Sequence, residues 1–137
     1  MSIDKKQQEL IQEFEMFPSW MEKYEYIIEL GKELTPIPDE LKTDDHLIRG
    51  CQSRVWLAAS KDENGVLHFT ADSDAIITKG IVALVIRVFN GEKGDDILHA
   101  SMDFLKEIGL MENLSPTRSN GLAAMIKQMK TYALILQ

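Results

Sequence analysis

The strongest constraint on the fold is the apolar segment from Ile76 to Phe89. Its valines and isoleucines favour a strand. Its length, and the preceding residues Asp72-Ser73-Asp74 whose side chains can cap a helix, favour a helix instead. Glycine at position 80 makes the helix about 1 kcal/mol less stable than alanine would. This cost indicates that another element packs too closely against Gly80 to leave room for a side chain. We therefore predict a buried helix over residues 76–89.

The segments before this helix predict a β-hairpin. From Val66 to Asp72 the residues alternate, so that Leu67 and Phe69 share one face of a strand. Asn64-Gly65 is a strong turn signal, and it separates this segment from the β-rich residues 54–60.

Capping residues mark the remaining helices. Ser2 and Ser19 can each cap one, with Glu22 completing a capping box after Ser19. A short turn around 95–98 and a helix capped by Ser101 follow, and Ser115-Pro116 starts the last helix. Together these elements predict one α+β domain over residues 1–137, with a small antiparallel sheet and helices packed mainly on one face.

Composition and charge exclude several classes of function. The net charge of −7 argues against binding to nucleic acid or to an anionic membrane surface. The longest apolar run is far too short to span a bilayer, and the N-terminus shows no signal sequence. A single cysteine excludes an internal disulfide and a multi-cysteine metal site. We expect a cytoplasmic protein with a reduced thiol, no metal and no cofactor of its own.

The single cysteine, Cys51, lies in the sequence Gly50-Cys51-Gln52-Ser53, between a loop that contains Pro36 and Pro38 and the first predicted strand. Glycine frees the backbone before the cysteine and suits an exposed turn, although a lone cysteine is more often a small buried residue. Residues 48–56 resemble the active-cysteine segment of the SufE family. Three further stretches agree in the same order: 20–31, 72–80 and 114–122.

The resemblance implies a fold similar to that of SufE and of the IscU scaffold proteins, and it implies the function of the SufE family. SufE proteins take persulfide sulfur from a pyridoxal-phosphate-dependent cysteine desulfurase of the SufS type and stimulate that enzyme. They pass the sulfur to an iron–sulfur scaffold of the SufBCD type. Cys51 is then the sulfur acceptor, in a transfer partner rather than an enzyme with its own small substrate. The sequence leaves a monomer and a homodimer equally open.

Two further residues, Asp74 and Arg118, are implicated by the resemblance in supporting the cysteine loop and sulfur transfer. From the residues alone, Asp74 is most simply a helix cap. Arg118 lies in the first turn of a helix, where a cation opposes the helix dipole. That placement indicates either a binding partner or a salt bridge to a nearby acid.

Two other functions stay open at this point. An iron–sulfur scaffold is disfavoured because clusters need several thiolates. A thiol-dependent hydrolase or transferase needs a histidine base, and neither His46, His68 nor His99 stands in a recognisable catalytic pattern. We also expect Cys51 to be shielded in the free protein, with candidate walls at Trp56, Ile76, Ile77 and Gly80.

Overall fold

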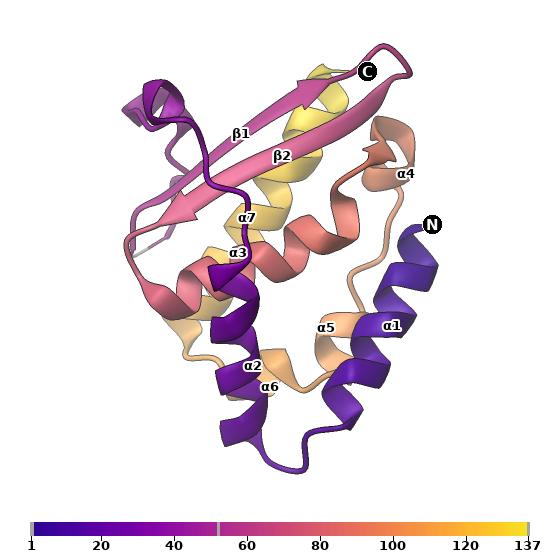
Figure 1. Ribbon diagram of the computed structural model, residues 1–137, viewed down its shortest axis with the longest axis vertical. Helices are drawn as coiled ribbons and strands as arrows, with labels where there is room; N and C mark the ends of the chain where they lie inside the picture. The colour runs from indigo at the N-terminus through magenta and orange to yellow at the C-terminus, as the bar shows by residue number, and fades with distance from the viewer. Residues whose placement is uncertain (1, 52, 137) are drawn as a thin grey trace.

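The computed structural model describes residues 2–51 and 53–136 and shows an α+β fold (Figure 1). Two helices, α1 and α2, precede a hairpin, and the remaining helices follow it. The helices are α1 (Ile3–Glu15), α2 (Trp20–Lys32), α3 (Ile76–Phe89), α4 (Gly94–Leu98), α5 (Phe104–Glu107), α6 (Leu110–Asn113) and α7 (Pro116–Ile135). The strands are β1 (Val55–Lys61), β2 (Val66–Ser73) and β3 (Glu92–Lys93), and two 3₁₀ turns, η1 (Asp39–Leu41) and η2 (Asp44–His46), lie before β1.

The sheet is antiparallel with the strand order β1-β2-β3. In the hairpin Leu57 pairs with Ala71 and Ala59 with Phe69, so apolar residues of both strands occupy the same face. Gly65 has a φ of +80° in the connecting turn, a conformation that glycine adopts without strain. The predicted hairpin is confirmed, with strand boundaries shifted slightly along the chain.

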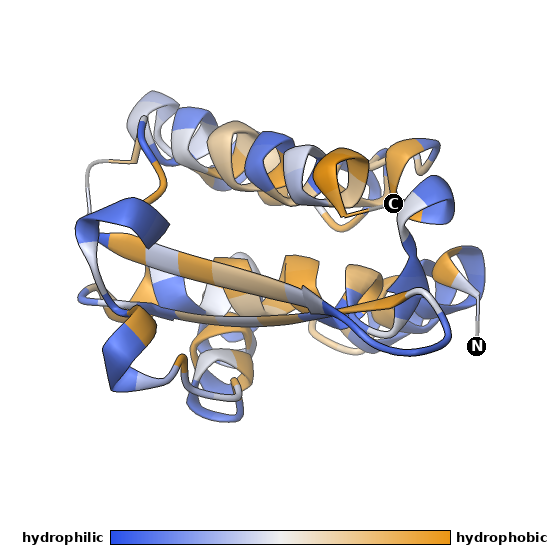
Figure 2. Ribbon diagram, turned by 90° about the horizontal axis from the view of Figure 1, so that it is seen from above, coloured by the Kyte–Doolittle hydropathy of each residue, from blue (hydrophilic) through white to orange (hydrophobic). Residues whose placement is uncertain are grey.

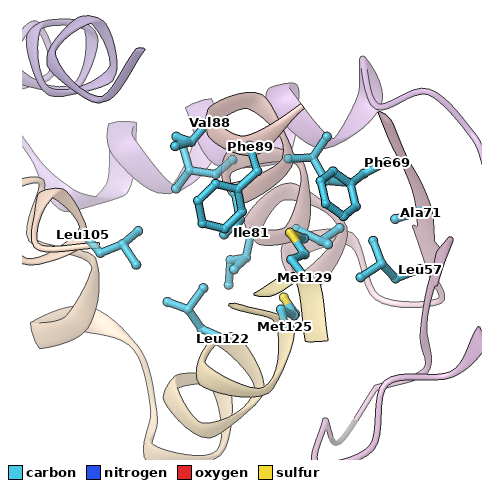
Figure 3. Packing of buried hydrophobic residues seen from close by; sticks show 14 of the residues in the cluster. Leu57, Phe69, Ala71, Ile81, Val88, Phe89, Leu105, Leu122, Met125 and Met129 are labelled. Carbon is cyan, nitrogen blue, oxygen red and sulfur yellow. The ribbon is translucent and has the colours of Figure 1, made fainter. Parts of the chain in front are cut away.

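One face of the hairpin carries the main core. In Figure 3 the hairpin side chains Leu57 and Phe69 lie on the side of the hairpin that faces α3 and α7. These helices contribute Ile81, Met125 and Met129 to the same cluster. All of these residues are buried. Seen from above, α7 runs along one side of the hairpin (Figure 2). The prediction that helices pack mainly on one face is therefore confirmed.

The other face of the hairpin is crossed by residues 36–47, which we call the strap (Figure 1). Pro36 forms a β-bridge with Ala71 at one edge of the hairpin, and Leu47 forms one with Trp56 at the other. Between them Lys42 lies 4.7 Å from the centre of the Trp56 ring and forms a salt bridge of 2.8 Å with Asp72. The strap delivers the chain to Cys51 in a fixed position.

α3 is the buried helix that the sequence predicts, and it crosses α2 at very short range. A Cβ atom on Gly80 would lie 2.2 Å from the carbonyl oxygen of Ile27, and one on Gly31 would lie 2.8 Å from the backbone nitrogen of Gly80. Both distances are far below van der Waals contact, so the two helix backbones touch directly. The close approach expected at Gly80 is confirmed.

Three of the predicted helix caps are confirmed, and the one at Ser101 is wrong. The Ser2, Ser19 and Ser115 side chains each accept a hydrogen bond from the backbone three residues on, as predicted. The prediction of a cap at Ser101 is wrong because α5 begins only at Phe104, after Asp103. The short helix α6 was not predicted, since Gly109 ends α5 with a φ of +84° and α6 starts directly after it. None of the helices within the described ranges is long and apolar enough to cross a membrane.

Candidate functional site

Cys51 lies at the point where the strap has ended and β1 has not yet begun. Ile48 is held to β1, because its backbone N–H donates to the Val55 carbonyl at 2.8 Å. Gly50 follows with a φ of +96°, which turns the chain toward α7. A Cβ atom on Gly50 would lie 3.4 Å from the Ala124 side chain. The cysteine loop is thus packed on the surface of α7.

The thiol of Cys51 is half-buried and is directed at α7. Its Sγ donates to the carbonyl oxygen of Gly121 at 3.5 Å, and the residue packs against the edge of the core. Burial raises the pKa of the Cys51 thiol above its ordinary value of 9.0. The resting form near neutral pH is therefore the neutral thiol, whereas attack on another sulfur needs the thiolate.

A small pocket of about 90 Å³ opens beside this thiol. Its walls come from the cysteine loop, the beginning of α3 and the first turns of α7. The described lining residues are Cys51, Ser53, Ala75, Thr78, Ile81, Thr117, Arg118, Gly121 and Met125. The Ser53 and Thr78 hydroxyls lie 3.4 Å apart, so either can donate to the other. The pocket therefore combines apolar side chains with several hydroxyl groups.

Asp74 holds the end of the cysteine loop against the start of α3. Its Oδ1 accepts a hydrogen bond of 3.0 Å from the backbone N–H of Arg54, and its own N–H donates to the Arg54 carbonyl at 3.2 Å. The Ser73 hydroxyl donates to the same carbonyl at 2.8 Å. The prediction that Asp74 caps the helix is wrong, because Ala75 occupies the cap position and no side chain caps α3 within the described residues.

Arg118 lines the pocket from the first turn of α7, with an exposed side chain. Its guanidinium donates to the Tyr24 hydroxyl at 3.4 Å, a long contact. No carboxylate of residues 2–51 and 53–136 lies within 4.0 Å of it. The salt-bridge explanation for Arg118 therefore finds no support in this part of the chain. Arg49 and Arg54 are exposed and do not appear in the described lining.

The remaining sequence-predicted site residues divide into three groups. Gly50 directly precedes Cys51 in the loop, and Ser53 lines the pocket. Gln52 falls outside the described residues. None of the four candidate walls, Trp56, Ile76, Ile77 and Gly80, is among the described residues that line the pocket. α3 contributes Thr78 and Ile81 instead, and the Trp56 ring lies beside Lys42 of the strap.

Sequence reasoning missed Thr78, Thr117 and Gly121 as parts of the site. Thr78 is a buried threonine, only 7% exposed, within an otherwise apolar helix. Gly121 lies inside a helix, where glycine is less stable than alanine, so its presence indicates a specific reason. Both signals were visible in the sequence, but neither says that the two helices meet at Cys51.

No histidine is found among the described residues that line the pocket. The His68 and His99 rings lie beside Asp62 and Asp95 at 2.9 and 3.4 Å, and His46 lies 3.3 Å from the Thr43 hydroxyl. Within the described ranges no group of three or more His, Cys, Asp or Glu side chains is arranged to hold a metal ion.

The family model for SufE, described as an Fe–S metabolism associated domain, matches residues 8–133. The chain belongs to the SufE family. This membership places it in iron–sulfur metabolism and in a family of sulfur-transfer partners rather than ordinary enzymes.

Individual relatives agree with the family model. An uncharacterized SufE-like protein of Rhizobium meliloti is 38% identical over 91% of this chain and 92% of its own length. One of Rhizobium etli is 37% identical over 91% and 87%. SufE-like protein 1, chloroplastic/mitochondrial, of Arabidopsis thaliana is 39% identical over 96% of this chain, which spans only 36% of that longer protein.

A solved structure shares the fold. The solution structure of a hypothetical protein from Thermus thermophilus superposes with a TM-score of 0.78 over 96% of this chain and 95% of that one. The two sequences are 20% identical, so the likeness concerns the fold alone.

Proposed function

We propose that this SufE-family chain is a sulfur acceptor and carrier that works in the cytoplasm. A pyridoxal-phosphate-dependent cysteine desulfurase supplies a cysteine persulfide, and the Cys51 thiolate attacks its terminal sulfur. The desulfurase cysteine leaves as a thiolate while Cys51 becomes the persulfide, so one sulfur–sulfur bond breaks, another forms and nothing is oxidised overall. Release of that cysteine stimulates the desulfurase, and the sulfur then passes to a scaffold that assembles iron–sulfur clusters.

The observation that carries this proposal is the half-buried thiol of Cys51 beside a small pocket in a SufE-family chain. A carrier needs one reactive sulfur and a sheltered place for it, because exposed persulfides are lost to oxidation and to other thiols. A thiol-dependent hydrolase would need a histidine base, and none is among the described residues of the pocket. A cluster scaffold would need several thiolates, and the chain has one cysteine.

The test is sulfur loading in the presence of a desulfurase. The chain is mixed with a SufS-type cysteine desulfurase and cysteine, alkylated, and weighed by mass spectrometry. We expect the mass of one or more sulfur atoms on Cys51 and a faster desulfurase. The Cys51→Ser variant should gain no sulfur and give no stimulation. A native chain that never carries sulfur, or equal stimulation by the variant, rejects the proposal.

We also propose that the loop around Cys51 opens when the desulfurase binds. A shielded thiol with a raised pKa reacts slowly, so transfer needs a more exposed state. An opening cost of a few kcal/mol leaves roughly 0.1–10% of molecules open before binding, and the partner shifts this population. Alkylation of Cys51 by iodoacetamide should therefore be slow in the free protein and faster with the desulfurase bound. Alkylation of the free protein at the rate of an unstructured cysteine peptide would contradict the shielding.

A further inference from the structure

Gly121 has an unusual combination of position and surroundings. It lies in the second turn of α7 and is buried. A Cβ atom placed on it would meet Cys51 first, at 3.5 Å from Sγ, 3.8 Å from Cα and 3.9 Å from Cβ. These are ordinary van der Waals contacts, so the unloaded protein has space for an alanine.

Helix stability favours alanine at this position. Glycine inside a helix loses more backbone entropy on folding than alanine does. Neither of the usual reasons for a glycine applies, because Gly121 is not among the positive-φ glycines and its added Cβ meets nothing closer than 3.5 Å among the described residues. At Gly80, by contrast, a Cβ atom would lie 2.2 Å from a backbone oxygen. The fold therefore requires glycine at 80 but not at 121.

We propose that the missing side chain of Gly121 makes room for the second sulfur atom of a Cys51 persulfide. This inference rests on the proposed sulfur-acceptor function. The second sulfur would be bonded about 2.05 Å from Sγ, and Gly121 and Cys51 are both walls of the same pocket. The pocket volume of about 90 Å³ exceeds the roughly 10–15 Å³ that one water-sized atom needs.

A methyl group on residue 121 would compete for that room. It would already be in contact with Sγ, so a second sulfur that extends from Sγ toward residue 121 would have to displace either the methyl group or the cysteine loop. Forcing extra atoms into occupied space destabilises a protein. Alanine at 121 should thus stabilise the protein with a free thiol and destabilise the protein that carries sulfur. Gly121 is in this sense a positioning residue for the transferred atom.

The first experiment measures competition for space without any desulfurase. Methyl methanethiosulfonate transfers an S-methyl group to the Cys51 thiolate and releases methanesulfinate, which leaves one extra sulfur and a methyl group on the residue. Melting temperatures are recorded for the native chain and for Gly121→Ala, each with and without this modification. Unmodified Gly121→Ala should melt roughly 3–5 °C above the native chain, and modification should lower its melting temperature by several degrees more than that of the native chain.

A matched control separates helix propensity from space at Cys51. Ala123→Gly changes an exposed residue two positions further along α7. It should melt a few degrees below the native chain but respond to modification as the native chain does. Equal shifts on modification in Gly121→Ala and the native chain overturn the inference. So does an unmodified Gly121→Ala that melts below the native chain, because packing would then explain the glycine.

The second experiment connects the space to sulfur transfer. With a SufS-type desulfurase and cysteine, Gly121→Ala should acquire sulfur about tenfold more slowly than the native chain, and Ala123→Gly at the native rate. Equal loading of Gly121→Ala and the native chain overturns the inference and leaves the acceptor function standing. If the native chain acquires no sulfur while the melting data show competition, the proposed function fails and the steric role of Gly121 remains.

Discussion

Two glycine contacts in this protein look alike in sequence and differ in physical purpose. At the crossing of α2 and α3, Gly31 and Gly80 bring two helix backbones so close that any side chain would collide with main-chain atoms. At the contact between α7 and the cysteine loop, Gly121 leaves ordinary van der Waals space next to Cys51. The first contact fixes the scaffold and the second leaves room beside a reactive atom. The comparison teaches that the nearest atom to a missing Cβ, rather than the glycine itself, shows which role applies.

The largest effect is expected at the helix crossing. Gly80→Ala places a methyl group 2.2 Å from the Ile27 carbonyl oxygen, so α2 and α3 must separate. We expect a loss of about 3 kcal/mol in the free energy of unfolding, measured by urea denaturation. Gly121→Ala, the same substitution at the other contact, should change stability in the opposite direction. A loss below about 1 kcal/mol for Gly80→Ala would show that the crossing adapts, and the contrast between the two contacts would disappear.

The next effect concerns Arg118 at the pocket. Arg118→Ala should slow sulfur acceptance from the desulfurase about tenfold, equivalent to about 1.4 kcal/mol, because a cation that lines the pocket suits an anionic sulfur group. Stability should change by less than about 0.5 kcal/mol, since the side chain is exposed. Arg49→Ala, at an exposed arginine two residues before Cys51, serves as the control for net charge. Equal effects of the two substitutions would remove Arg118 from the site, and a large drop in melting temperature would make it structural.

The next effect concerns the hydrogen bond from Arg54 to Asp74, which holds the end of the cysteine loop. Asp74→Ala removes the acceptor for the Arg54 N–H and should cost about 1 kcal/mol of stability. Alkylation of Cys51 by iodoacetamide should become several-fold faster, because the end of the loop is less restrained. Asp96→Ala is the control, at an exposed aspartate with no side-chain hydrogen bond among the described residues. If alkylation is equally fast in both variants, the Asp74 contact does not restrain the thiol.

The smallest effect is the dependence of stability on pH. Burial raises the pKa of Cys51 in the folded protein, so the unfolded chain releases this proton first as pH increases. Stability from this group is complete below the unfolded pKa and is lost as pH rises through the folded pKa. The native chain should therefore lose slightly more stability than Cys51→Ala between about pH 8 and about pH 10, in paired urea titrations. A smaller loss in the native chain would mean that the thiolate, not the thiol, is the form that the fold favours.

Most of the fold could be predicted because its signals are local. The alternation around Leu67 and Phe69 and the Asn64-Gly65 turn specify a hairpin within a few residues of sequence. Gly80 signalled a close helix contact before its partner was known. The predictions that Asp74 and Ser101 cap helices were wrong, because a polar side chain beside a helix can form its hydrogen bond with a loop or a turn as well as with the helix.

The site was predictable only in part, for a different reason. The segment around Cys51 could be recognised from its resemblance to SufE. The walls of its pocket could not, since they depend on where α3 and α7 pass each other. The Asp74–Arg54 contact joins the residues just before β1 and just after β2, and it depends on the exact strand register, which the turn signal alone does not specify. Local patterns predict elements, whereas the angle between two helices decides which faces meet.

The two anchors of the cysteine loop set a limit on its reach. Before Cys51, the Ile48 backbone is hydrogen-bonded to Val55. After Cys51, the Arg54 backbone is hydrogen-bonded to the Asp74 side chain. Cys51 is three positions along the chain from each anchor, and a fully extended chain covers about 3.3–3.6 Å per residue. While both anchors hold, the Cys51 backbone can travel roughly 10 Å from either of them at most. Under the proposed function, a sulfur donor must therefore bring its reactive cysteine to within roughly 10 Å of these two anchors, unless one of the anchors is released.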